Sequence, residues 1–298
     1  MRSHFRSTGT LLAAALAMVA CSPPGAQSSV ASPATTPACG PDPLVEGYVL
    51  AETIRCTWGV ASSCSFAGSA YQHGLAVDRD LRRAREYYRQ ACDLGSQDDC
   101  ALFGGAVFKL GEKARYPELF PIWEQACEKG SVFGCHAAGL AWTVDAAQLG
   151  VATDVARGRA FFAKACAARY MVSCGAEARL VAQTKDSASY ATAQAELVKA
   201  CDLQERESCQ FLAQTELYGT FGSKNEAAAA GHFWEACRFG LGSGCSALAY
   251  LNAVGIGVPK DLNKARKLAE VTCKELHDES ACKAAQTSDF APLAPEVP

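Results

Sequence analysis

Cysteine is the residue type with the clearest chemical potential in this chain of 298 residues. Two of the sixteen cysteines, Cys21 and Cys39, stand alone, and the other fourteen form pairs eight or nine positions apart. Paired cysteines bind metal or form disulfides, but zinc sites usually place them two to four residues apart, and no CxxC occurs here. We therefore expect seven disulfides and no metal site. The expected bridges are Cys56 with Cys64, Cys92 with Cys100, Cys127 with Cys135, Cys166 with Cys174, Cys201 with Cys209, Cys237 with Cys245 and Cys273 with Cys282.

Each pair must bridge a reversal of the chain. Residues eight apart on one straight helix are separated by about 12 Å, whereas a disulfide needs Cα atoms roughly 4.4–6.8 Å apart. The residues between the cysteines, such as DLGSQDD and EKGSVFG, favour a turn. One helix therefore ends near the first cysteine and the next begins near the second. Seven such staples predict a heat-resistant protein that is sensitive to reduction.

The pairs recur with a period typical of a repeat array. The first cysteines of successive pairs are 35 to 39 residues apart. From the second pair onward, a small residue stands one position before the first cysteine and an apolar one four positions before it. In the repeats, Gly or Ala stands four positions after the second cysteine, and three positions after it there is usually an apolar residue such as Ala67, Phe103 or Leu212. These spacings give stripes on two α-helices, the first helix of a repeat beginning near a second cysteine and the second helix ending near the next first cysteine. Glycines mark the turn between them in four repeats, at Gly74, Gly111, Gly219 and Gly255.

The N-terminus has the layout of an export signal. Residues 1–20 combine a basic start with the apolar run Thr10–Ala20. Because this run ends at Cys21, it resembles a bacterial lipoprotein signal, in which that cysteine is acylated; an ordinary cleaved signal is the alternative. Ser22 favours the outer membrane for a lipoprotein. We expect an exported protein in the outer membrane or periplasm if it is a lipoprotein, and an extracellular one otherwise.

Composition divides the rest of the chain and excludes some classes of function. Residues 21–42 are rich in Pro, Ser and Ala, which predicts a flexible tether, and the Pro-rich residues 291–298 predict a disordered tail. The folded part is then 43–290. The net charge of −3 provides no basic excess for nucleic acid, and the apolar run is too short to span a bilayer. We expect contact with a membrane only through lipid on Cys21.

Two segments resemble a known repeat family. The run 255–265 (GIGVPKDLNKA) is similar to the signature turn and helix start of the Sel-like repeat (SLR) family, and the run 74–84 is a looser copy. The spaced cysteine pairs resemble the cysteine-rich Hcp subgroup of secreted SLR proteins. The resemblance covers about 43–290, with two departures. Glu177 stands where an apolar residue belongs, and the third repeat carries an insertion around Asp145–Thr153.

The resemblance implies a fold and a capping arrangement. SLR proteins are all-α, right-handed solenoids of αα-hairpins. Six full units would run from 64–92 to 245–273, each hairpin stapled by one disulfide. Half-units Pro43–Cys56 and Cys282–Phe290 would cap the two ends, because terminal repeats must cover an exposed apolar face.

The search for catalytic residues gives little. The motifs HExxH, GxSxG and the P-loop are absent from the sequence. Because Hcp proteins have been described as penicillin-binding with weak β-lactamase activity, the resemblance implies such a hydrolase as the alternative function. The run Ser280-Ala281-Cys282-Lys283 matches S-x-x-K, but K-T-G is missing and Cys282 is assigned to a disulfide. We expect no catalytic residue and no cofactor.

A binding surface is the remaining functional expectation. Stacked αα-hairpins form a concave face on which extended ligands bind, and the first helices would line it. A protein, a peptide or a peptidoglycan fragment would suit such a face. The alternative is that its aromatic residues pack between repeats. The candidate groove residues are Phe66, Phe108, Arg179, Gln183, Phe211, Tyr218 and Tyr250.

Overall fold

The computed structural model describes residues 43–298, and within this range it contains helices and no strand. The expected signal (1–20) and tether (21–42), with Cys21 and Cys39, lie outside the described residues. The α-helices are α1 (Pro43–Thr57), α2 (Ala61–His73), α3 (Leu81–Asp93), α4 (Gln97–Lys109), α5 (Tyr116–Glu128), α6 (Val132–Trp142), α7 (Ala146–Leu149), α8 (Val155–Ala167), α9 (Met171–Thr184), α10 (Tyr190–Asp202), α11 (Arg206–Tyr218), α12 (Glu226–Arg238), α13 (Gly242–Val254), α14 (Leu262–Leu276) and α15 (Glu279–Thr287). Short 3-10 helices are η1 (Lys113–Arg115), η2 (Ser187–Ser189) and η3 (Ala291–Leu293).

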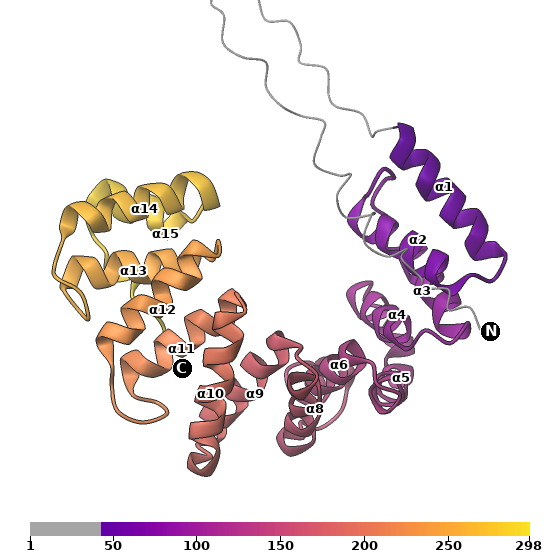
Figure 1. Ribbon diagram of the computed structural model, residues 1–298, viewed down its shortest axis with the longest axis horizontal. Coiled ribbons are helices and arrows are strands. Elements are labelled where there is room, and N and C mark those ends of the chain that lie inside the picture. Colours follow the sequence, from indigo (N-terminus) through magenta and orange to yellow (C-terminus); the bar gives the residue numbers. More distant parts are fainter. Residues whose placement is uncertain (1–42) are drawn as a thin grey trace, which may run out of the picture. The chain divides into compact units, whose positions relative to one another are not determined.

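The helices form a solenoid-like series of antiparallel pairs (Figure 1). Six repeats follow one another as α2/α3, α4/α5, α6/α8, α9/α10, α11/α12 and α13/α14, and each helix packs on the next one along the chain. Helix α1 lies before the first repeat and α15 after the last. The predicted all-α repeat fold is confirmed.

One disulfide joins the second helix of each repeat to the next helix along the chain, which is α15 after the last repeat, and a further one joins α1 to α2. In the α3–α4 hairpin, Cys92 is the penultimate residue of one helix and Cys100 lies in the first turn of the next. The Cα atoms of the seven bridged pairs are 4.4 to 4.8 Å apart. The bonded pairs are Cys56 with Cys64, Cys92 with Cys100, Cys127 with Cys135, Cys166 with Cys174, Cys201 with Cys209, Cys237 with Cys245 and Cys273 with Cys282.

These bridges agree with the pairing that the cysteine spacing predicts. The second cysteines Cys64, Cys135 and Cys209 are buried at 0%, 5% and 0% exposed, so their sulfur atoms serve packing as well as bonding. The predicted single disulfide per hairpin is therefore confirmed. So many disulfides indicate an oxidising location outside the cytoplasm.

Local signals in the sequence explain where the helices of a repeat begin and end. Gly74 ends α2 in the left-handed conformation, with φ of 72°, a region that favours glycine. The Asp80 side chain then accepts hydrogen bonds from the first backbone amides of α3. In the same way, Gly255 ends α13 in the left-handed conformation, and the Asp261 side chain accepts a hydrogen bond from a backbone amide of α14. These pairs fix the turn that makes the two helices of a repeat antiparallel.

Glycine allows the two helices of a repeat to approach closely. A Cβ built on Gly104 of α4 would lie 2.8 Å from Cε2 of Trp123 on α5. Gly68 meets Tyr88 and Gly139 meets Phe162 in the same way, at 2.6 Å. In the next three repeats the equivalent positions are Ala178, Ala213 and Ala249. The first three repeats thus place a glycine on the first helix directly beneath an aromatic ring of the second.

The two irregular repeats differ from the others as the sequence indicates. The insertion of the third repeat forms α7, whose Leu149 is buried. In the fourth repeat, Glu177 pairs with Arg159 of α8 at 3.4 Å. The guanidinium of Arg159 also reaches Asp186 at 2.5 Å. An ion pair between repeats thus replaces the apolar contact that the repeat pattern calls for at this position.

The C-terminal tail differs from the expected disordered segment. Residues 291–293 form η3, and Leu293 is only 4% exposed. Leu293 packs with Phe290 against alanines of α13, α14 and α15. The burial of Leu293 explains why this segment is ordered. A composition rich in proline predicts disorder, but it does not show that an apolar site is available for this leucine.

Candidate functional site

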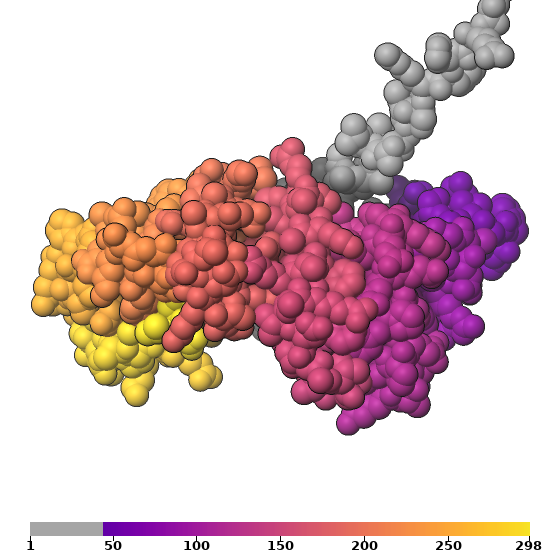
Figure 2. All heavy atoms as spheres, turned by 90° about the horizontal axis from the view of Figure 1, so that it is seen from below, coloured from indigo at the N-terminus to yellow at the C-terminus, as the bar shows by residue number. Residues whose placement is uncertain are grey.

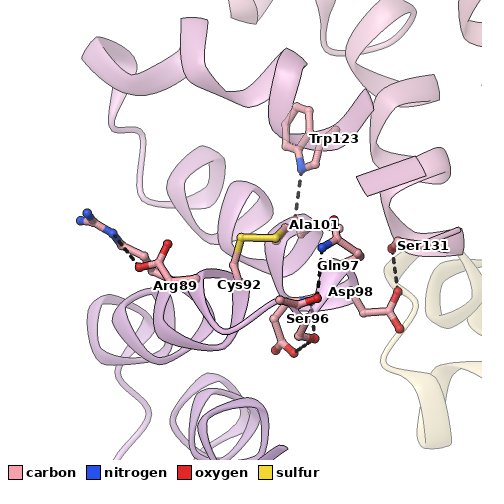
Figure 3. The surroundings of a disulfide bond; sticks show 12 residues. Arg89, Cys92, Ser96, Gln97, Asp98, Ala101, Trp123 and Ser131 are labelled. Atoms are coloured by element: carbon pink, nitrogen blue, oxygen red, sulfur yellow. Dashed lines mark hydrogen bonds and ion pairs between the residues drawn. A yellow bond between two sulfur atoms is a disulfide. The ribbon is translucent and has the colours of Figure 1, made fainter. Parts of the chain in front are cut away.

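The first helices of neighbouring repeats are joined by polar contacts near the disulfides. Ser65 of α2 donates to Asp99 of α4. Ser131, at the start of α6, donates to Asp98 of α4 at 2.6 Å (Figure 3). Further along, Ser243 of α13 donates to Gln210 of α11 at 2.5 Å. We call the surface formed by α2, α4, α6, α9, α11, α13 and α15 the first-helix face.

Histidine 136 belongs to this same row of contacts. Its Nδ1 lies 2.9 Å from Ser173 Oγ, the residue before the second cysteine of the following pair. The ring packs against Phe162 and Tyr170. Burial in this setting lowers the pKa of His136 to about 4. Sequence reasoning missed these contacts, although serine or aspartate at the residue before the second cysteine, as at Asp99 and Ser173, was a visible signal.

Three of the predicted groove residues are mainly packing residues. Phe66 is half-buried against Tyr48, with ring centroids 5.0 Å apart. Phe108 is half-buried against Tyr116 at 5.4 Å. Phe211 is buried, at 5% exposed. For these aromatics the structure favours the alternative that they pack within and between repeats.

Arg179 and Gln183 form an accessible polar pair on the same face. Both residues are exposed, and they are four positions apart on α9, so they lie along one side of the helix. The Arg179 guanidinium lies over the Phe211 ring of α11, 5.1 Å from its centroid. The protein around the guanidinium partly desolvates it, which lowers the pKa of Arg179, although Glu205 and Glu207 raise it in part. Among the described residues no carboxylate forms an ion pair with this guanidinium.

Tyr218 and Tyr250 lie where the C-terminal tail crosses the face. Both are half-buried. The Tyr218 hydroxyl donates to the carbonyl oxygen of Pro295 at 2.5 Å. Burial, with a smaller contribution from Tyr250, raises the pKa of Tyr218, so its phenol remains a donor at neutral pH. A cavity of about 280 Å³ lies here between α11, α13, the start of α15 and the tail.

The disulfides and the acidic residues do not form a convincing metal centre. Among residues 43–298, one group of three brings Cys166 Sγ and oxygens of Glu177 and Glu196 within 4.8 Å of one another. Cys166 is bonded to Cys174 and is therefore no thiolate. Glu177 is paired with Arg159. We assign no metal to this group.

The S-x-x-K run gains no catalytic surroundings from the fold. Ser280 and Lys283 are both exposed on α15, and Cys282 between them is bonded to Cys273. Ser288, the start of the partial S-D-N match, accepts a hydrogen bond from Arg266 at 2.8 Å. A serine hydrolase requires a nucleophile held beside its base. No such contact is formed by Ser280 within the described part of the chain.

None of the helices in residues 43–298 has the length and apolar character needed to cross a bilayer.

Together, the paired helices, the glycine turns and the disulfide staples define a repeat protein built from αα-hairpins. The family model of the Sel1 repeat matches residues 61–96 and 242–274, which are the first and last parts of the array. These two segments are therefore Sel1 repeats.

Solved structures share this fold. A protective antigen of uropathogenic Escherichia coli that displays an SLR fold matches with a TM-score of 0.69 and 17% identity, over 84% of this chain and 54% of that one. This chain thus spans about half the length of that antigen. A Sel1 repeat protein from Oxalobacter formigenes matches with a TM-score of 0.51 and 15% identity, over 85% and 86%. Helicobacter pylori cysteine rich protein B is 29% identical over 41% of this chain and 88% of that one, with a TM-score of 0.34. No curated protein matches the sequence.

Proposed function

We propose that this protein is an exported scaffold of the cell envelope that binds an extended segment of a protein partner on its first-helix face. The observation that carries the proposal is the guanidinium of Arg179, which is held over Phe211 and has no ion-pair partner among the described residues. A cation fixed on a ring and left without a carboxylate is suited to an acidic group of a ligand. Gln183, one turn further along α9, offers both a donor and an acceptor to a peptide backbone.

The remaining parts of the chain fit this proposal. The sequence of residues 1–20 supports export, and Cys21 supports attachment through lipid, with residues 21–42 as a tether. An array that is stapled at each hairpin keeps its binding face rigid, which lowers the entropy lost when a ligand binds. Such arrays bind partners through shape and surface residues, so a protein segment or peptide is the expected ligand class.

A selection of displayed peptides tests the proposal directly. The oxidised full-length protein serves as bait, and selected peptides are then titrated against Arg179→Ala and Gln183→Ala. We expect enrichment of acidic peptides and a loss of at least about tenfold in affinity for Arg179→Ala, since a hydrogen bond to a charged group contributes about 1.5–3 kcal/mol. The matched control is Arg82→Ala, an exposed arginine on α3, which should leave the affinity unchanged.

Two results decide against the proposal. If the selected peptides bind Arg179→Ala and Gln183→Ala as tightly as the unchanged protein, the ligand does not use this face. If no peptide is selected, while soluble peptidoglycan fragments bind and depend on Arg179, the face binds cell-wall material and not a protein segment.

A further inference from the structure

The C-terminal tail is held on the first-helix face at two points. Leu293 and Phe290 are buried in the apolar cluster formed with α13, α14 and α15. Beyond them, Tyr218 of α11 donates a hydrogen bond to the carbonyl of Pro295, 77 positions away in sequence. Figure 2 shows the yellow C-terminal residues lying against the orange repeats. A short peptide of the chain thus already lies across α11 and α13.

The tail crosses the face in an extended conformation. Ala294 has φ of −58° and ψ of 132°, close to the polyproline II values of about −75° and +145°. Pro295 explains this, because a residue before proline is driven out of the α region. A polyproline II segment makes no internal hydrogen bonds, so its carbonyls remain available to donors such as Tyr218. Recognition of this kind, with a tyrosine and an exposed carbonyl, is a recurring mode for proline-containing peptides.

The tail leaves part of the polar lining beneath it unused. Ser246 of α13 is 6% exposed, and its hydroxyl has no hydrogen-bond partner among the described residues. It lines the cavity of about 280 Å³ together with Gln210 and Gln214 of α11. A buried hydroxyl without a partner costs stability. A ligand that fills the cavity more completely than the tail would satisfy it.

We propose that this part of the face binds proline-containing extended peptides, and that residues 294–296, which line the cavity, hold this place in cis until such a peptide displaces them. The inference rests on the proposed function, because it assigns a ligand class to one end of the first-helix face. Leu293 anchors the tail in the core. The segment that follows it is short, and it can detach from the face without disturbing the core. The tail would then act as a built-in competitor, present at an effective concentration of the order of millimolar.

The test compares the full-length protein with a variant that ends at Leu293. The probe is a fluorescein-labelled peptide with the sequence of residues 291–298, titrated by fluorescence anisotropy. We expect the shortened protein to bind the probe about tenfold more tightly than the full-length protein, because the competitor has been removed. The full-length variant Pro295→Ala should also bind the probe more tightly than the unchanged protein, and it does so without shortening the chain.

Further variants identify the recognised features. In the shortened protein, Tyr218→Phe should weaken binding about fivefold through loss of one hydrogen bond. The matched control Tyr48→Phe, on α1, should have no effect. A probe in which all three prolines are replaced by alanine should bind at least fivefold more weakly.

The outcomes separate this inference from the proposed function. Equal binding of the probe by the full-length and shortened proteins overturns the cis occupancy. Undiminished binding of the alanine probe overturns the ligand class, as does an unchanged affinity in Tyr218→Phe. If the probe fails while acidic peptides still bind in a manner that depends on Arg179, this inference is wrong and the proposed function stands.

Discussion

Replacing Gly104 by alanine should destabilise the second repeat, although alanine is the better helix former. The added Cβ would lie 2.8 Å from Cε2 of Trp123 and closer still to Nε1. Carbon contacts are favourable at about 3.5–4.0 Å, so the ring would have to move by about 1 Å. Trp123 is 3% exposed and donates its indole N–H to the Ala101 carbonyl at 3.1 Å. The movement therefore strains the core and breaks a buried hydrogen bond at the same time.

The magnitude follows from three effects. Overpacking costs about 1–3 kcal/mol, and an indole N–H left without a partner costs about 1–3 kcal/mol. The higher helix propensity of alanine relative to glycine offsets about 1 kcal/mol of this loss in stability. The expected net loss in free energy of unfolding is about 1–5 kcal/mol. The adjacent Gly105 is a matched control, because a Cβ there meets no atom within 4 Å, and Gly105→Ala should stabilise by up to about 1 kcal/mol.

Urea unfolding of the oxidised proteins, followed by circular dichroism, measures both effects. A rescue variant sharpens the test, since the fourth repeat pairs Ala178 with Leu197 at the equivalent positions. Adding Trp123→Leu to Gly104→Ala should therefore cost less than the sum of the two single changes. If Gly104→Ala proves as stable as Gly105→Ala, the close approach of the two helices is not what requires glycine, and the packing argument is wrong.

Three further predictions concern the rest of the chain. The lowered pKa of His136 means that the unfolded chain binds more protons between about pH 4 and 6.5, so this contribution to stability is complete above pH 6.5 and is lost on acidification. The shift in pKa corresponds to about 3 kcal/mol of stability, reduced to about 2 kcal/mol by partial exposure. Thermal unfolding measured across this pH range should show a weaker dependence of stability on pH for His136→Asn than for the unchanged protein. Replacing Cys237 and Cys245 together by alanine should lower the free energy of unfolding by about 2.5 kcal/mol, measured in urea; an unchanged midpoint would show that the staple contributes nothing. Mass spectrometry should find lipid on Cys21, and an unmodified N-terminus after that residue would refute the lipoprotein assignment.

The repeat fold was predictable because its signals are periodic. Cysteines at a fixed spacing, with small residues next to them, report the same hairpin seven times, so an irregular copy such as the one with Glu177 does not obscure the pattern. The glycine–aromatic pairs were equally visible, since Gly104 and Trp123 stand at fixed distances from their nearest cysteines. The interactions that hold one hairpin together join residues that are close in sequence. They can therefore be predicted from a single sequence.

The first-helix face was less predictable because it depends on contacts between repeats. Helical spacing placed Phe211 and Arg179 on first helices, but it could not show that one would lie buried beneath the other. The contact of His136 with Ser173 joins residues 37 positions apart. Such contacts depend on how successive hairpins are rotated against each other, and no local pattern records that rotation.

The last repeat explains why the tail has both a structural and an exchangeable part. Where earlier second helices place an aromatic or leucine four residues before the cysteine, α14 has Ala269, which faces Ala249 of α13. Two alanines leave a volume of the core unfilled, and the side chains of Phe290 and Leu293, which follow α15, fill it. The core therefore requires the chain as far as Leu293. After that residue the described contacts are the hydrogen bond from Tyr218 and the lining of a partly filled cavity, so a peptide can replace these residues without unfolding the cap.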